Sequence, residues 1–101
     1  MSDKLDFSNQ TEVHRSNGQV SSEIDGESII LNLKDGKYYG LDKVGARIWD
    51  LIQEPKTVQQ IQDELLEEFE VEPEACLQDL LALLRDLAEH QLIEVRNEMA
   101  G

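Results

Sequence analysis

The side chains best suited to metal binding or nucleophilic chemistry in this chain are those of His14, Cys76 and His90. A zinc site needs such ligands clustered at a recognised spacing, but these three lie on separate predicted elements. A catalytic thiol needs a general base and an oxyanion site beside it. Cys76 instead falls on an apolar helix stripe, which is typical of a buried, inert thiol. We therefore expect no metal site, no cofactor and no catalytic residue.

The carboxylates are numerous but do not form an acid–base pair. Pairs such as Glu67-Glu68 and Glu72/Glu74 are typical of a solvated surface, and the chain has no glycine-rich phosphate loop. An acyl carrier protein would share the small, acidic character. However, no serine here lies in the Asp-Ser-Leu motif that holds the prosthetic arm of such a carrier. The sequence predicts a protein that is not an enzyme.

The charge balance excludes one large class of partners. Of the 101 residues, 9 are Lys or Arg and 22 are Asp or Glu, which leaves a formal net charge of −13. Phosphate backbones bind clusters of Lys and Arg, so we expect no nucleic-acid partner. The charge favours a cationic peptide or protein, although an acidic surface also serves solubility alone.

The compartment is indicated by what the sequence lacks. Cys76 is the only cysteine, so no internal disulfide can form, which suits a reducing cytosol. No apolar run approaches the ~20 residues that cross a bilayer, and Met1–Asn9 lacks the apolar core of an export signal. We expect one small, acidic, cytoplasmic domain with no membrane span.

Two hairpin signals organise the first half of the chain. Asp25-Gly26 and Asp35-Gly36 are pairs that specify two-residue turns. They separate the runs Gln19–Ile24, Ser28–Leu33 and Lys37–Leu41. Counting across both turns predicts a three-stranded antiparallel meander. Its last strand then lies at a sheet edge with a single lysine as a charged guard.

Alternation along these strands assigns each side chain to one of two faces. The face predicted to pack on the helices holds Val20, Ile24, Ile29, Leu31, Leu33 and Tyr38. The other, more polar face holds Ile30, Asn32, Lys34, Lys37, Tyr39 and Leu41. Tyr38 is therefore expected in the core and Tyr39 outside it.

Capping residues predict three helices after the meander. Asp42 is a suitable N-cap for a helix over Lys43–Gln53. Thr57-Val-Gln-Gln60 fits the capping box that opens a second helix. Pro73 suits the first turn of a third helix, which continues over Glu74–His90.

The third helix carries more apolar surface than one buried face requires. Six leucines lie within the eleven residues Leu77–Leu87, and the apolar arc spans about 180°, against about 100° for a helix buried on one side. The arc consists of two adjacent stripes, Leu77, Leu81, Leu84 and Ala88, and Cys76, Leu80, Leu83 and Leu87. A surplus stripe beside an open strand edge suits an extended peptide. Alternatively, packing of the third helix against both other helices and the sheet would account for the whole apolar arc.

These elements predict an α+β fold, in which a three-stranded antiparallel sheet is followed by three helices in a winged helix-turn-helix-like arrangement. We expect a flexible arm over residues 1–17, with any order near Phe7 or Val13. A recognition domain over residues 18–96, closed by a strand at Gln91–Val95, and a flexible tail over residues 97–101 would follow. DNA binding is a common use of this shape, but the third helix sets four acids against the single Arg85 and would be repelled.

Four parts of the sequence carry a resemblance to a known family: Gly36–Ile52, Thr57–Ile61, Glu68–Val71 and the run from Asp79 to Leu92-Ile93. In this order they resemble the signature of the PqqD-like family, over about Val20–Val95. The chain departs from the family at Asp42, where many relatives have Asn. It also departs at His90-Gln91, where Lys-Gly is common.

The resemblance implies a recognition element for ribosomally synthesised and post-translationally modified peptides (RiPPs). Such an element binds the leader segment of a precursor peptide as an added strand and presents it to maturation enzymes. On this chain the strand would be Lys37–Leu41 and the helix beside it Glu74–His90. The chain looks most like the stand-alone proteins of lasso-peptide pathways, whose partners are the precursor, a leader peptidase and a cyclase. A pyrroloquinoline quinone or other RiPP pathway stays open, as does an acidic adaptor that recruits a modifying enzyme.

The residues predicted to bind the leader are Lys37, Tyr38, Tyr39, Gly40, Leu41, Cys76, Asp79, Leu80, Leu83, Asp86 and Leu87. Backbone groups of the strand would pair with the leader, and the apolar side chains would receive its anchors. Asp79 and Asp86 would hold a Lys or Arg of the leader, and Tyr39 is the favoured tyrosine contact. The identity of the precursor, the oligomeric state and the surface that docks the enzymes stay open. So does the question of whether the arm covers the strand edge.

Overall fold

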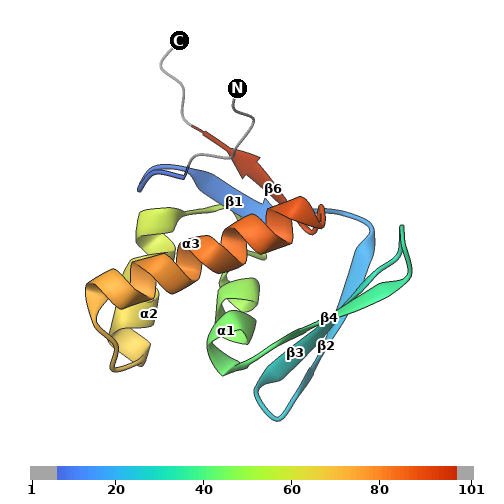
Figure 1. Cartoon of the computed structure of the whole chain (residues 1–101), viewed down its shortest axis with the longest axis horizontal. Coiled ribbons are helices and arrows are strands. Elements are labelled where there is room, and N and C mark those ends of the chain that lie inside the picture. Colours follow the sequence, from blue (N-terminus) through green and yellow to red (C-terminus); the bar gives the residue numbers. More distant parts are fainter. Residues whose placement is uncertain (1–6, 98–101) are drawn as a thin grey trace.

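The computed structural model describes residues 7–97, which form two small antiparallel sheets and three helices (Figure 1). The elements are β1 (Glu12–Arg15), β2 (Gln19–Ile24), β3 (Glu27–Asn32), β4 (Lys37–Leu41), α1 (Lys43–Leu51), β5 (Lys56–Thr57), α2 (Val58–Glu68), α3 (Pro73–Glu89) and β6 (Ile93–Arg96). The predicted α+β class with three helices is confirmed. No helix in the described range is long and apolar enough to cross a bilayer.

The predicted meander is present. The first sheet has the order β2-β3-β4, and both strand pairs are antiparallel. Ile24 pairs with Glu27, so Asp25-Gly26 forms the expected two-residue turn. The two turn residues have positive φ angles of 55° and 82°, as a type I′ turn requires.

The second turn is longer than predicted. Asn32 pairs with Lys37, so the loop holds the four residues 33–36 rather than Asp35-Gly36 alone. Asn32 stabilises this loop because its Oδ1 accepts a hydrogen bond from Lys34 N at 2.9 Å. Its backbone oxygen also accepts one from Gly36 N at 2.8 Å. Compared with the pairing predicted for a two-residue turn, the register of β3 on β4 shifts by two residues. Because side chains alternate with a period of two, each residue keeps its predicted face.

The meander packs through the face that the sequence analysis placed outside, so that prediction was wrong. Ile30, Asn32 and Leu41 are buried, and Tyr39 is half-buried. The opposite face points to solvent and leaves large apolar side chains 41–70% exposed. These exposed side chains are Val20, Ile24, Ile29, Leu33 and Tyr38.

Hydrogen bonds to polar side chains explain this inversion. On the inner face, Ser21 Oγ accepts a hydrogen bond from Trp49 Nε1 at 3.1 Å. Asn32 Nδ2 donates to His90 O, also at 3.1 Å. The Tyr39 ring packs against the His90 ring, with 4.6 Å between the ring centroids. Polar groups that have partners can be buried, so the number of apolar residues on a face does not decide which face packs inward.

A second sheet, of order β5-β1-β6, includes a strand within the predicted arm, at Val13, where order was expected. β1 lies within residues 1–17, pairs with β6 and β5, and buries Val13 completely. This strand holds one apolar residue and pairs with strands far along the chain, so the local pattern indicated order near Val13 but not a strand. β6 confirms the expected C-terminal strand, at Ile93–Arg96 rather than Gln91–Val95. The ends of the predicted arm and tail, residues 1–6 and 98–101, lie outside the described residues.

The helices begin where the capping residues predicted. Asp42 Oδ1 accepts a hydrogen bond from Gly45 N at 2.9 Å, and Thr57 and Gln60 exchange both capping-box hydrogen bonds. α1 ends at Leu51, short of its predicted end. The largest buried side chains of the core are those of Trp49, Ile30, Ile48, Ile52, Ile61, Leu65, Leu80, Leu84, Leu92, Val13 and Val58.

Two neighbouring isoleucines on β3 test the orientation of the sheet, since Ile30 is fully buried and Ile29 is 41% exposed. Ile30→Ala should lower the free energy of unfolding by about 2–5 kcal/mol, the usual cost of such a truncation in a core. Ile29→Ala should cost less than about 1 kcal/mol. Urea unfolding followed by circular dichroism measures both. Equal losses, or a larger loss for Ile29→Ala, would contradict the observed orientation.

Candidate functional site

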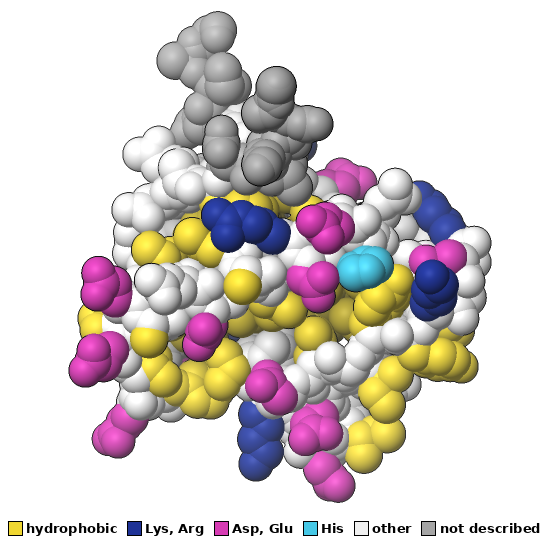
Figure 2. All heavy atoms as spheres, in the orientation of Figure 1, with side chains coloured by type: hydrophobic (Ala, Val, Ile, Leu, Met, Phe, Trp, Pro, Cys, Tyr) yellow, Lys and Arg dark blue, Asp and Glu magenta, His cyan; other side chains and the backbone are white. Residues whose placement is uncertain are grey.

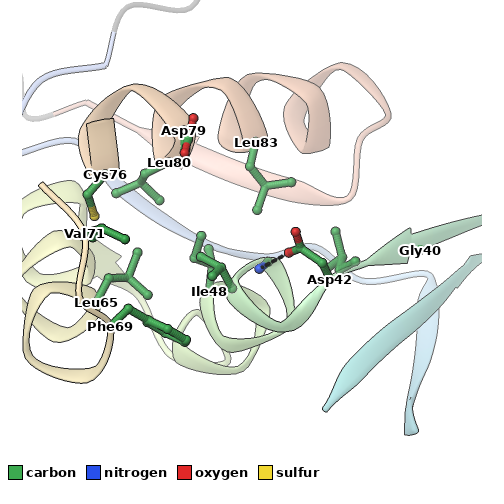
Figure 3. Close-up of a pocket in the computed structure, with 13 residues that line it drawn as sticks. Gly40, Asp42, Ile48, Leu65, Phe69, Val71, Cys76, Asp79, Leu80 and Leu83 are labelled. Carbon is green, nitrogen blue, oxygen red and sulfur yellow. Dashed lines mark hydrogen bonds between the residues drawn. The ribbon is translucent and has the colours of Figure 1, made fainter. Parts of the chain in front are cut away.

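A cavity of about 520 Å³ opens between the end of β4, α1, the C-terminal part of α2 and α3 (Figure 3). The residues that line it are Gly40, Leu41, Asp42, Val44, Gly45, Ile48, Leu65, Phe69, Val71, Cys76, Asp79, Leu80 and Leu83. Figure 2 shows hydrophobic side chains below α3 on this face of the molecule, with acidic side chains around them. The cavity therefore combines apolar walls with a negative rim.

The junction of β4 and α1 forms one wall. Asp42 directly follows β4 and caps α1, which places its carboxylate at the cavity. Gly45 permits this tight junction, because a Cβ at this position would lie 3.3 Å from both Asp42 Oδ1 and Leu41 Cβ. Ile48, about one turn further along α1, also lines the cavity. The helix thus starts directly at the strand end and contributes an apolar side chain.

α3 forms the opposite wall. Cys76 and Leu80 are buried, Leu83 is half-buried, and Asp79 lies exposed at the rim. Leu84 is also buried but does not line the cavity. The apolar arc of α3 therefore serves both purposes that the sequence left open, packing in the core and lining a groove.

β4 is an edge strand. Its strand partner among residues 7–97 is β3, so backbone groups along its other side can pair with a further strand. Tyr39 helps to hold β4, because its ring packs against His90 and its hydroxyl lies 3.5 Å from Asp35 Oδ2. Desolvation and the nearby Asp35 carboxylate raise the pKa of Tyr39 above its ordinary value, so the hydroxyl stays neutral.

Six of the predicted leader-binding residues line the cavity: Gly40, Leu41, Cys76, Asp79, Leu80 and Leu83. Lys37, Tyr38 and Tyr39 lie on the same strand but outside the lining, and Tyr38 is the outward tyrosine, contrary to prediction. The reason is that β4 packs through the face of Tyr39. Leu87 is buried in the core, and Asp86 lies near the end of α3. The roles of all these residues in leader binding stay predictions.

The contributions of α1 and α2 to the cavity were not predicted from the sequence. Val44 and Ile48 come from α1, and Leu65 and Phe69 come from the end of α2. Helical periodicity identifies such positions as apolar, but it does not distinguish a core contact from a cavity wall. Val71 could have been identified as a candidate binding residue from the sequence, because it is an apolar residue between two glutamates. In the structure its side chain is 44% exposed.

The charges at the cavity are negative. Asp42 and Asp79 line it, and no Lys, Arg or His does so within the described range. Burial raises the pKa of the Cys76 thiol, and the Asp79 carboxylate adds to the shift because it disfavours a thiolate. Residues 7–97 contain no group of three potential metal ligands. The site suits noncovalent binding of an extended chain with apolar and cationic side chains.

The fold and the site define a small α+β binding domain with an open strand edge beside an apolar cavity. The sequence model of the family described as coenzyme PQQ synthesis protein D (PqqD) matches residues 27–93. Comparison with curated proteins finds no significant match. The chain belongs to the PqqD family.

Solved structures share this fold. TbiB1, in complex with the TbiA(beta) leader peptide, is 39% identical with a TM-score of 0.74, over 87% of this chain and 99% of that chain. Lasso peptide synthetase B1, complexed with the leader peptide, is 21% identical with a TM-score of 0.72, over 81% and 96%. The PqqD truncation of Methylobacterium extorquens PqqCD, a stand-alone RiPP recognition element, is 21% identical with a TM-score of 0.73, over 88% and 95%. At 21% identity, the last two similarities establish the fold alone.

The single cysteine allows a test of the cavity wall. Iodoacetamide at pH 8 should alkylate Cys76 about tenfold or more slowly in the folded protein than in the guanidinium-unfolded chain, because burial limits access and disfavours the thiolate. As the pH rises through about 8.5, the ordinary pKa of a thiol, the rate of Cys76 alkylation should increase first in the unfolded chain. Mass spectrometry of the labelled fraction gives both rates. Equal rates in the two states would contradict a buried Cys76.

Proposed function

We propose that this protein binds the leader segment of a ribosomally synthesised precursor peptide. The observation that carries the proposal is that the open edge of β4 runs directly into an apolar cavity at Gly40 and Leu41. The leader adds to β4 as a further strand and lies in the cleft beside α3. The 39% identity to TbiB1, which was solved with a leader peptide, supports this assignment.

Backbone pairing supplies affinity with little sequence preference. In an antiparallel pair, alternate residues of the edge strand direct both N–H and C=O to the added strand, so β4 can hold an extended peptide whatever its side chains. Specificity then depends on apolar leader side chains that leave water to contact Ile48, Leu80 and Leu83. Asp42 and Asp79 attract a Lys or Arg beside those anchors, and each such exposed pair adds about 0–1 kcal/mol.

The winged helix-turn-helix-like arrangement is part of this proposal. α2, α3 and β6 follow one another as two helices and a closing strand, which supports the predicted arrangement. A duplex would meet a chain of formal charge −13, and phosphates require clustered cations. In this protein the groove beside α3 receives a peptide instead.

The bound leader is presented to the enzymes that act on the precursor. We assign the chain to a cytoplasmic lasso-peptide pathway, with a separate leader peptidase and a cyclase as partners. The resemblance of the sequence to the stand-alone proteins of lasso-peptide pathways favours this pathway, and the 39% identity to TbiB1 supports binding of a leader peptide. The protein holds the substrate and supplies no chemical step or cofactor of its own.

A calorimetric titration tests the proposed function. The titrant is the synthetic leader of the precursor encoded next to the gene of this protein. A scrambled peptide of the same composition is the control, because it carries the same net charge. The leader should bind one to one and the scrambled peptide should not bind. Absence of leader binding to the folded protein, or equal binding of both peptides, would contradict the proposal.

A charge placed in the cavity should abolish much of the affinity. Leu83→Asp should weaken leader binding at least tenfold, which is about 1.4 kcal/mol, because apolar anchors would then meet a carboxylate. Leu81→Asp is the matched control, since Leu81 is also half-buried on α3 but does not line the cavity. It should keep the wild-type affinity. Calorimetry gives both affinities and circular dichroism verifies the fold. Equal weakening by the two substitutions would place the site elsewhere.

Amide chemical shifts distinguish leader binding from the adaptor alternative. Strand addition should shift the backbone amide signals of Lys37–Leu41, because their hydrogen-bond partners change from water to peptide. An adaptor that recruits a basic enzyme through acidic helices would instead shift signals in Glu64–Glu72. Two-dimensional NMR spectra of the labelled protein, with and without the leader, measure both regions. Shifts confined to the second region would favour the adaptor.

A further inference from the structure

Gly40 lies within β4 although the folded chain does not require a glycine there. Its φ angle is not among the positive values, which in this chain belong to Gly18, Gly26 and Gly36. Apart from its two chain neighbours, a Cβ built at Gly40 would have no atom of another residue within 4 Å. Glycine weakens a strand, because it contributes no packing and loses more entropy on folding. A glycine that neither conformation nor space demands points to something that approaches this strand from outside the chain.

A second cavity borders Gly40 and the outer face of the sheet, and its lining also includes the buried Ser28 and Leu41. Gly40 pairs with Ile29 across the β3–β4 ladder, so both positions point to this face. The cavity measures about 500 Å³, and its lining includes Gly40, Ile29 and Ile24. Ile29 and Ile24 are 41% and 58% exposed, so they offer apolar surface that the chain itself does not cover.

Gly40 also lines the first cavity, together with Leu41 and Asp42, which likewise line both. A peptide strand paired with β4 therefore passes both cavities. Its successive side chains point to opposite faces of the sheet, so an extended peptide can fill the cavity beside α3 and the cavity over Gly40 with different residues.

We propose that Gly40 is a specificity-determining position. It accepts a bulky apolar side chain, aromatic or long aliphatic, from the residue of the bound peptide that lies opposite it. This inference rests on the proposed leader binding and adds a second anchor to it. Residues directly opposite one another in antiparallel strands have Cβ atoms about 4.5–5.5 Å apart on the same face. The peptide side chain leans across the glycine onto Ile29 and Ile24, and this cover compensates for the packing that a strand glycine lacks.

Gly40→Val separates folding from binding. Valine has open space in the free protein and suits a strand better than glycine, so the melting temperature should stay equal or rise. In the complex the valine side chain occupies the space of the peptide side chain, so affinity for the synthetic leader should fall tenfold or more. Ser22→Val is the matched control, because Ser22 pairs with Ile29 from the other side, on the same outer face, and lines neither cavity. It should leave affinity unchanged.

A leader peptide scan identifies the residue concerned. Each bulky apolar residue of the leader is replaced by Ala in turn, and each peptide is titrated into wild-type protein and Gly40→Val. One replacement should weaken binding to the wild type and have little further effect on the variant, which is the signature of two positions in contact. Wild-type affinity in Gly40→Val, a lower melting temperature for it, or additive effects for every replacement would overturn the inference and leave leader binding intact. If the wild type does not bind the leader at all, the proposed function fails, and this inference fails with it.

Discussion

The side chain of Asn32 connects the two parts of the molecule on which the candidate site depends, the β2-β3-β4 sheet and α3. Its Nδ2 donates to His90 O at the end of α3, and its Oδ1 accepts from Lys34 N in the β3–β4 loop. The residue is only 4% exposed, and a buried amide without such partners would cost about 1–3 kcal/mol. These hydrogen bonds therefore favour one orientation of the first sheet against α3, with the polar face inward.

That orientation explains where the cavity lies. In the middle of β4 the ring of Tyr39 packs against His90, which brings the strand close to the end of α3. At the C-terminal end of the strand, Gly40 and Leu41 line the cavity together with Leu83 of α3. An open strand edge and an apolar cavity are thus adjacent, as binding of a peptide in strand form requires. The same orientation turns the apolar side chains of Ile29 and Tyr38 to solvent.

Local signals predicted most elements, because their causes lie within a few residues. The caps at Asp42 and Thr57 form as expected, and Asp25-Gly26 adopts its two-residue turn. The prediction failed where distant contacts compete with local preference. The Asn32 hydrogen bonds lengthen the second turn to four residues, and β1 exists because β5 and β6, far along the chain, pair with it.

The sequence by itself determined the class of the fold, the three helices, and the meander with β4 at its edge. It also indicated the apolar stripe of α3 that contributes Cys76, Leu80 and Leu83 to the cavity. Tertiary structure alone decided which face of the sheet is buried and which side chains of α1 and α2 complete the cavity. The physical reason is that periodicity reports which residues share a face, whereas burial depends on the hydrogen-bond and packing partners that other elements bring to that face.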